Sequence, residues 1–276
     1  MKIYLNGEIV DKGQVGELFE PGFLFGWGAF ETLRSYAVKT AASGRPAFLK
    51  EHLERLNESL DFLGLDRPQI DFGAEFSRLM GENDLRDAYL RVTVYKKKNS
   101  LGVILDASEF NYYRDDVYEK GVKLVPAPFS RFSRDQFLKI KSVSYVKNRL
   151  AWAAAQKQGA EEAIFFNEKG FIQEGSRSNI FFIKGRRIFT PAADCGLLEG
   201  VTRKAVLDIC RQQSLSVAED EYTLEDLFSA EEVFITSSLM EVMPVREIDG
   251  KQFKVKNYTL TPAIRALYKK SAQGEV

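Results

Sequence analysis

Strand-like and helix-like patterns alternate along both halves of this 276-residue chain, and that alternation limits the folds open to it. The first residues predict a hairpin, because the strand-like runs Lys2–Leu5 and Glu8–Val10 flank Asn6-Gly7, a pair that favours a tight turn. An amphipathic helix is then predicted from a stripe of leucines at helical spacing: Leu49, Leu53, Leu56, Leu60 and Leu63. A chain that mixes both patterns throughout is typical of α/β and α+β proteins.

The same patterns continue to the end of the chain. Further helices are predicted at 70–85, 144–158, 201–213 and 259–270. Further strands are predicted at 88–95, 121–125, 163–166, 179–183, 187–189 and 232–236. The polar segment Asn111–Lys120 is the candidate linker. We therefore predict two α/β domains, residues 1–115 and 116–276.

Charge and composition exclude several classes of partner. The formal net charge of +0 argues against nucleic acid or an acidic membrane surface as the main partner. No apolar run reaches the roughly 20 residues needed to cross a bilayer, and the first residues do not resemble a signal peptide. Cys195 and Cys210 do not make a disulfide framework, and small buried hydrophobes are their ordinary role. We expect a cytoplasmic protein.

His52 is the single histidine, so a Ser-His-Asp or Cys-His centre could be built only around it. His52 and the two cysteines are too scattered for a zinc-ligand spacing, and we predict no metal site. Proton transfer in an enzyme of this composition would fall to a lysine, a tyrosine or a carboxylate. A lysine attached to a cofactor is one standard solution.

Three segments have features that bind anions. Gly196–Arg203 places a glycine turn directly before a predicted helix, where free amides and the helix dipole favour phosphate. Phe234–Ser238 ends an apolar strand with three hydroxyls, and ligands of α/β proteins usually bind at strand ends. Arg55 offers a bidentate donor. Each has an ordinary alternative: a helix cap, a turn and a solvated helix face. The chain lacks a P-loop and a dinucleotide fingerprint, so a nucleotide is the weaker candidate ligand.

Glu174 and Lys141 are candidates for acid–base chemistry. Glu174 lies in a turn before the apolar run 180–183, either as a surface glutamate or as a carboxylate held near a cation such as a protonated pyridinium. Lys141 ends the basic loop Arg131–Lys141, and spacing alone does not separate it from Lys139 or Lys147.

Together, these segments resemble the class IV aminotransferase family, the fold-type IV enzymes that use pyridoxal 5′-phosphate (PLP). The resemblance extends over essentially the whole chain, and the motifs occur in the family's order. They are Gly22–Arg34, Glu51–Leu56, Ile140–Ser142, Gln173–Phe181, Thr190-Pro191, Gly196–Arg203, Glu231–Thr236 and Pro244-Val245. Each motif is weak alone, but the ordered set is specific.

The resemblance implies a role for each candidate residue. Lys141 would carry PLP as a Schiff base and move the proton between the substrate and the cofactor. Glu174 would keep the pyridine nitrogen protonated, and Tyr145 would reach the ring hydroxyl. The implied phosphate site consists of the Arg55 side chain, the amides of Val201 and Thr202, and the two residues Ser237 and Ser238.

The resemblance also implies a two-domain subunit, with an N-terminal α/β sandwich domain (1–115) and a C-terminal pseudo-barrel α/β domain (116–276) that binds PLP. A homodimer would complete the substrate pocket, for which Phe30, Tyr89 and Arg91 are candidates. Tyr89-Leu90-Arg91 resembles a family motif in which the arginine helps to place the substrate carboxylate. The alternative for Arg91 is a structural ion pair within a strand.

The motifs Gly22–Arg34 and Ser238–Val245 resemble aminodeoxychorismate lyases most. We therefore expect release of pyruvate from 4-amino-4-deoxychorismate, which leaves 4-aminobenzoate for folate synthesis. Two segments depart from that pattern: Lys96–Ser100 replaces a glycine-rich loop, and Ala37–Arg45 is longer than the usual turn. The alternative is an amino-acid aminotransferase that uses a branched-chain L- or D-amino acid with 2-oxoglutarate. A binding protein that has lost catalysis is disfavoured, because Lys141, Glu174 and Arg55 are all present.

Overall fold

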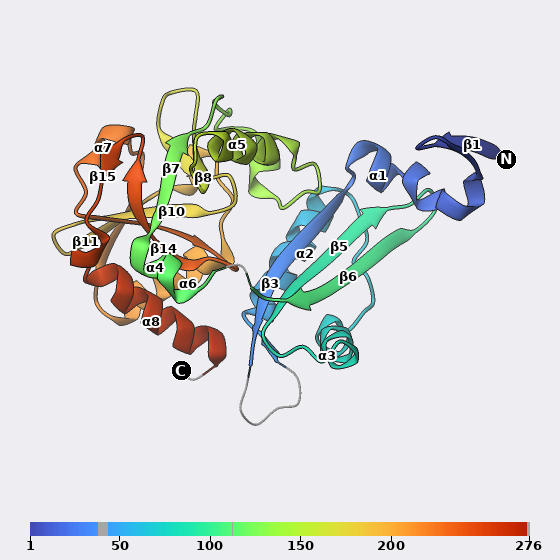
Figure 1. Cartoon of the computed structure of the whole chain (residues 1–276), viewed down its shortest axis with the longest axis horizontal. Helices are drawn as coiled ribbons and strands as arrows, with labels where there is room; N and C mark the ends of the chain where they lie inside the picture. Colours follow the sequence, from blue (N-terminus) through green and yellow to red (C-terminus); the bar gives the residue numbers. More distant parts are fainter. Residues whose placement is uncertain (38–43, 112, 275–276) are drawn as a thin grey trace.

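The computed structural model describes residues 1–37, 44–111 and 113–274. Within these ranges the strands form a two-stranded, a four-stranded and a nine-stranded sheet, and the two larger sheets lie next to each other (Figure 1). Most of the long segment Ala37–Arg45 lies outside the described residues.

The N-terminal hairpin is confirmed. Strands β1 (Lys2–Leu5) and β2 (Glu8–Asp11) pair antiparallel, with Leu5 opposite Glu8. Asn6 and Gly7 have φ values of 51° and 103°, the positive angles that a two-residue hairpin turn requires. The hairpin lies at the end of the molecule farthest from the nine-stranded sheet (Figure 1).

The four-stranded sheet has the order β4-β3-β5-β6 and is antiparallel throughout. Its strands are β3 (Gly28–Tyr36), β4 (Arg45–Pro46), β5 (Ala88–Lys96) and β6 (Leu101–Glu109). Helices of this half are η1 (Lys12–Phe19), α1 (Pro21–Phe25), α2 (Leu49–Phe62) and α3 (Phe72–Glu82). Strand β6 was not predicted.

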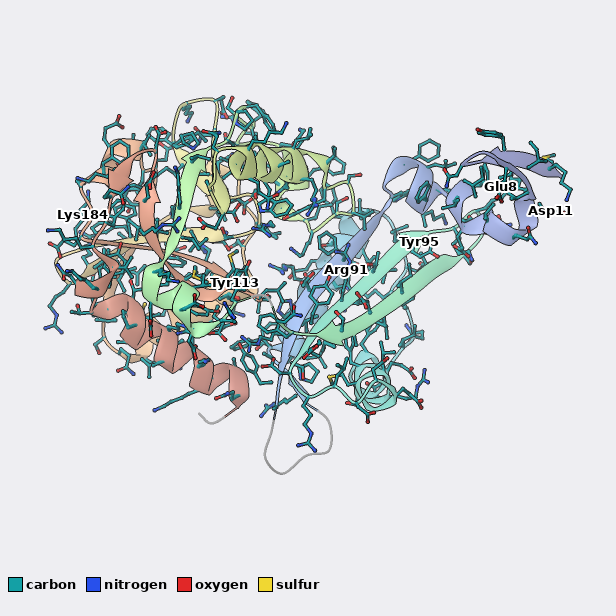
Figure 2. All side chains as sticks on the ribbon, viewed as in Figure 1. Glu8, Asp11, Arg91, Tyr95, Tyr113 and Lys184 are labelled. Atoms are coloured by element: carbon teal, nitrogen blue, oxygen red, sulfur yellow. The ribbon has the colours of Figure 1, made fainter. Side chains whose placement is uncertain are left out.

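One face of the four-stranded sheet packs on α2 and α3. Leu33 and Leu90 of the sheet share a core with Leu56 and Met80 of the helices, so the predicted leucine stripe is the buried face of α2. Side chains alternate along a strand, which places Arg91 on the opposite face. Figure 2 shows Arg91 on the part of the sheet nearest the C-terminal half.

The nine-stranded sheet has the order β12-β11-β10-β13-β14-β7-β8-β9, with β15 paired to β14. Its strands are β7 (Val122–Pro126), β8 (Glu162–Phe166), β9 (Ile172–Gly175), β10 (Asn179–Lys184), β11 (Arg187–Pro191), β12 (Ser216–Asp220), β13 (Glu232–Ser237), β14 (Glu241–Ile248) and β15 (Lys251–Gln252). Its helices are α4 (Asp115–Lys120), η2 (Gln136–Lys139), α5 (Val146–Lys157), η3 (Ala193–Cys195), α6 (Val201–Gln212), α7 (Leu224–Phe228), η4 (Val255–Asn257) and α8 (Leu260–Gln273).

Strand β10 is buried on both faces. Ile180 and Phe182 pack into one apolar cluster, and Phe181 and Ile183 pack into another. This double burial explains why the strand is an unbroken apolar run in the sequence. Among the described residues, no helix is long and apolar enough to span a bilayer.

The predicted linker Asn111–Lys120 is corrected by the structure. Its second half forms helix α4, whose Tyr118 is buried in the core of the C-terminal half. Acidic residues begin this helix and Lys120 ends it, with Lys120 Nζ 3.0 Å from Asp116, an arrangement that stabilises short helices. The domain boundary after residue 115 stays a prediction.

Glu232 is expected to stabilise the start of α8. Its buried carboxylate accepts backbone hydrogen bonds from Thr259 (2.6 Å), Leu260 (3.1 Å) and Thr261 (2.8 Å). Burial alone would raise the pKa of Glu232, but these hydrogen bonds outweigh it and hold the pKa below its ordinary value. A depressed pKa stabilises the fold above the unfolded pKa of about 4.3, and this contribution is lost as the pH falls through the folded pKa.

We expect Glu232→Gln to lower the free energy of unfolding by about 2–3 kcal/mol at pH 7, and by less near pH 3.5. Urea denaturation at both pH values measures the difference, with the exposed neighbour Glu231→Gln as control. An equal loss at the two pH values would show that the charge of Glu232 does not stabilise the fold.

Candidate active site

Lys141 lies where the two halves of the chain meet. Its carbonyl accepts a hydrogen bond from Phe30 N of β3 (2.9 Å), and its amide donates to Ser59 Oγ of α2 (3.2 Å). The next residue, Ser142, forms an isolated bridge with Ala29. The backbone of Lys141 is therefore fixed against the N-terminal half by residues that are distant in the sequence.

The Lys141 amine lies among rings and charges of both halves. Its Nζ is 4.8 Å from the centroid of the Phe30 ring and 5.7 Å from that of Tyr145. Burial lowers the pKa of Lys141 to about 8, with Arg55 adding to the effect and Glu174 opposing it. About a tenth of the amine is neutral at pH 7 with such a pKa, so Lys141 can act as a nucleophile and a base near neutral pH.

Arg55 is part of a buried network and not a solvated helix face. Its guanidinium donates twice to Glu31, at 2.7 and 2.8 Å, and once to the carbonyl of Glu199 (3.1 Å). Glu31 is fully buried on β3 and also accepts from His52 Nδ1 at 2.7 Å. The hydroxyl of Ser238, in the turn after β13, lies 3.2 Å from His52 Nε2. The network thus joins α2, β3, the turn before α6 and the turn after β13.

The protonation of His52 determines what the Ser238 hydroxyl can do. Burial lowers the pKa of His52, so the ring is neutral near pH 7, donates from Nδ1 to Glu31 and accepts at Nε2 from Ser238. The hydroxyl of Ser237 accepts from Met240 N at 3.1 Å. In this arrangement the hydroxyl proton of Ser238 points to His52. The backbone amide of Ser238 and the hydroxyl of Ser237 are then the groups that could donate to an anion.

Helix α6 begins at Val201, as predicted, after Gly200. No side chain of the described ranges caps it, so the amides of Val201 and Thr202 are open to an anion. Gly200 lies so close to the Asn179 side chain that a Cβ atom there would collide with it. Because Arg55 bonds to the neighbouring carbonyl of Glu199, the guanidinium and the helix start face the same space.

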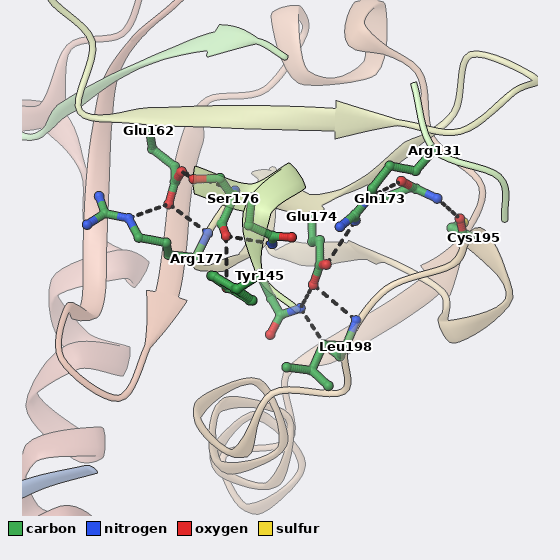
Figure 3. Close-up of polar contacts among 11 residues, drawn as sticks. Arg131, Tyr145, Glu162, Gln173, Glu174, Ser176, Arg177, Cys195 and Leu198 are labelled. Atoms are coloured by element: carbon green, nitrogen blue, oxygen red, sulfur yellow. Dashed lines mark hydrogen bonds and ion pairs between the residues drawn. The ribbon is translucent and has the colours of Figure 1, made fainter. Parts of the chain in front are cut away.

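Glu174 is buried at the end of β9 and fixed from two sides. Arg131 donates to its Oε1 (2.8 Å), and the amide of Leu198 donates to its Oε2 (3.0 Å) (Figure 3). Burial raises the pKa of Glu174, and Arg131 is the main influence against that rise. Tyr145 donates to the carbonyl of Ser176 at 3.0 Å, just beyond the same strand (Figure 3).

Phe30 and Arg91 lie beside the Lys141 amine. The Arg91 guanidinium is 3.9 Å from the centroid of the Phe30 ring, and its Nε donates to Thr93 Oγ1. Among the described carboxylates Arg91 has no salt bridge, so the alternative of a structural ion pair is not what the structure shows. Tyr89 precedes Arg91 by two positions and lies on the same face of β5.

The structure adds Glu31, His52 and Arg131 to the residues predicted from the sequence. Glu31 and His52 orient Arg55 and Ser238, and Arg131 contacts Glu174. A weak signal existed for two of them, since Glu31 lies in the motif Gly22–Arg34 and His52 lies three residues before Arg55 on α2. Nothing in the local sequence distinguishes Arg131 from other arginines of its basic loop.

The sequence model of the family described as amino-transferase class IV matches residues 28–248 of this chain. The chain belongs to this family. The match spans β3 to β14 and so includes the whole cluster around Lys141. The family predicted from the motifs is confirmed.

Known proteins match over nearly the full length. A Methanocaldococcus jannaschii protein provisionally named a branched-chain-amino-acid aminotransferase is 35% identical over 269 residues, which cover 91% of this chain and 89% of that protein. The aminodeoxychorismate lyase of Bacillus subtilis is 29% identical over 286 residues, which cover 99% of this chain and 96% of the lyase.

A solved structure matches closely as well. The branched-chain aminotransferase from the thermophilic archaeon Thermoproteus uzoniensis, crystallised with norvaline, superposes with a TM-score of 0.83 at 28% identity, covering 100% of this chain and 95% of that one. The predicted fold-type IV architecture is therefore confirmed. PLP is the cofactor typical of this family, and the chain is a PLP-dependent transaminase or lyase.

Proposed function

We propose that this chain is an amino-acid aminotransferase of the branched-chain type, with PLP attached to Lys141. The half-buried amine of Lys141, close to Arg55, Glu174 and Arg91, is the observation that carries the assignment of the PLP site, and the identity of the relatives carries the choice of reaction. When bound, PLP supplies an electron sink for the negative charge left when the substrate loses its Cα proton.

The residues of the site fit PLP on three sides. Arg55 and the uncapped start of α6 provide a cation and free amides suited to a phosphate. Glu174 provides a buried carboxylate for the ring nitrogen, and Lys141 provides an amine of lowered pKa. Each group has the charge and hydrogen-bonding character that its side of the cofactor requires.

The same residues would handle the substrate. Arg91, which has no carboxylate partner among the described residues, is placed to bind a substrate carboxylate beside the Phe30 ring. Lys141 would remove and return the substrate proton, with Tyr145 packed edge-on to Phe30 at a centroid distance of 5.4 Å. A second copy of the chain would close the pocket, and the homodimer and the cytoplasmic location stay predictions.

The comparisons favour the aminotransferase over the lyase that we expected first. The M. jannaschii relative, named for branched-chain amino acids, is 35% identical, and the lyase of B. subtilis is 29% identical. The lyase remains the second candidate, because that relative matches 99% of this chain. Release of pyruvate would begin with loss of the same substrate proton, so Lys141 could serve either reaction.

Three parallel assays of the PLP-loaded protein separate the candidates. We expect turnover of L-leucine that requires 2-oxoglutarate, and little turnover of D-alanine with the same acceptor. Aminodeoxychorismate is the third substrate. Formation of pyruvate and 4-aminobenzoate from it without an acceptor, with no L-leucine turnover, would overturn the proposal in favour of the lyase. Turnover of D-alanine alone would assign the opposite handedness.

A further inference from the structure

Arg131 is a buried arginine that contacts Glu174. It lies after β7, where its amide donates to the carbonyl of Phe166 (3.0 Å). Only 6% of the residue is exposed. The guanidinium stacks 3.9 Å from the centroid of the Phe165 ring, and its Nε donates to Gln173 Oε1 at 2.9 Å. These contacts orient the Arg131 side chain independently of Glu174.

Arg131 also forms an ion pair with Glu174, in which Arg131 Nη2 lies 2.8 Å from Glu174 Oε1 (Figure 3). The other oxygen, Oε2, accepts from Leu198 N at 3.0 Å and lies 3.5 Å from Asn179 Nδ2. Gln173, the neighbour of Glu174, also donates to the carbonyl of Cys195 at 2.8 Å. The Glu174 carboxylate is thus hydrogen-bonded to Arg131 on one side and to the loop before α6 on the other.

The charge of Glu174 depends on these two contacts. A buried carboxyl group tends to become neutral, whereas a cation in hydrogen-bond contact keeps it ionised. Burial is the largest influence on the pKa of Glu174, and the charge and hydrogen bond of Arg131 are the next two, in the opposite direction. Removal of the Arg131 charge would remove the largest influence that lowers the pKa of Glu174. Burial would then raise that pKa further.

We propose that Arg131 is a positioning residue that keeps Glu174 ionised and oriented toward the cofactor ring, and so sets the protonation of the ring nitrogen. The inference rests on the proposed PLP site. Only an ionised Glu174 can stabilise a protonated pyridine nitrogen. Arg131 itself acts through Glu174.

The direct test is the ring nitrogen itself. The protein is loaded with PLP labelled with ¹⁵N in the ring, and the ¹⁵N chemical shift reports whether that nitrogen carries a proton. We expect a protonated nitrogen in the wild type and in Arg131→Lys, and an unprotonated one in Arg131→Gln. We also expect kcat of Arg131→Gln to fall about 10-fold or more, because the electrostatic contact to Glu174 is lost, while Arg131→Lys recovers most of kcat.

Two controls separate a positioning role from lost stability. Glu232→Gln weakens a buried carboxylate network at the opposite end of β13 and is expected to leave the ¹⁵N shift unchanged. The second control is the double variant Arg131→Gln/Glu174→Gln. Because residue 174 is already neutral in Glu174→Gln, the added Arg131 substitution should not change the ¹⁵N shift further. If Arg131→Gln does not fold, the comparison of Arg131→Lys with the wild type and with Glu174→Gln carries the test.

A protonated nitrogen in Arg131→Gln, or a kcat loss no larger than that of Glu232→Gln, would overturn the inference. Failure of the proposed function would be seen in the wild-type protein, either as no attachment of PLP to Lys141 or as the lyase reaction in place of L-leucine turnover. Failure of the Arg131 inference would be seen only in the Arg131 variants and would leave both wild-type results intact.

Discussion

Lys141→Ala is expected to abolish covalent attachment of PLP and to lower turnover by at least about 10³-fold. Lys141 is the amine whose pKa is lowered to about 8 next to Phe30, Arg55 and Glu174. Alanine removes both the attachment point and the group that moves the substrate proton. Steady-state kinetics with saturating PLP measure the loss of turnover, and denaturing mass spectrometry after borohydride reduction measures the attachment.

Lys139→Ala is the matched control, because Lys139 lies two residues away in the same basic loop. We expect it to keep near wild-type turnover and full attachment. If Lys141→Ala retained attached PLP while Lys139→Ala lost it, the assignment of the lysine would be wrong.

Glu174→Gln is expected to lower kcat about 100-fold, the size usually seen when one preorganised electrostatic contact is lost. Glutamine has nearly the same shape and can still accept a hydrogen bond from Leu198 N, but it cannot stabilise a protonated ring nitrogen. It also leaves Arg131 buried without its carboxylate, and breaking a buried pair in this way costs about 3–5 kcal/mol of stability.

The measurements for Glu174→Gln are kcat and KM with saturating PLP, together with the free energy of unfolding. Glu168→Gln serves as control, because Glu168 is an exposed carboxylate that accepts from the backbone of Ser133 near the same segment. A kcat of Glu174→Gln within about threefold of the wild type would show that its charge is not used in the reaction.

Local patterns predicted the elements that are determined by near neighbours in the sequence. The Asn6-Gly7 hairpin and the leucine face of α2 follow from turn preference and helical spacing, which depend on near neighbours only. Strand β6 was missed although Leu101, Val103, Leu105 and Ala107 alternate along it. The polar sequence of helix α4 predicts a linker, and only its tertiary packing shows that Tyr118 is buried.

The site was less accessible to local reasoning. Nothing near Lys141 separates it from Lys139 in the sequence, and the resemblance in motif order selected it. The structure supplies a physical reason, since the backbone of Lys141 is bonded to Phe30 and Ser59. Glu31 and Arg131 contribute through partners 24 and 43 positions away, and such long-range pairs are not encoded in spacing. Substrate choice was the weakest prediction, because both reactions use the same lysine.

The role of Lys141 is tested by locating the covalent bond to PLP in the wild-type protein. The PLP-loaded enzyme is reduced with borohydride, digested, and its peptides are sequenced by mass spectrometry. We expect a phosphopyridoxyl group on Lys141 and on no other lysine. A group on Lys139, Lys147 or another lysine, or no modified peptide from fully loaded protein, would contradict it.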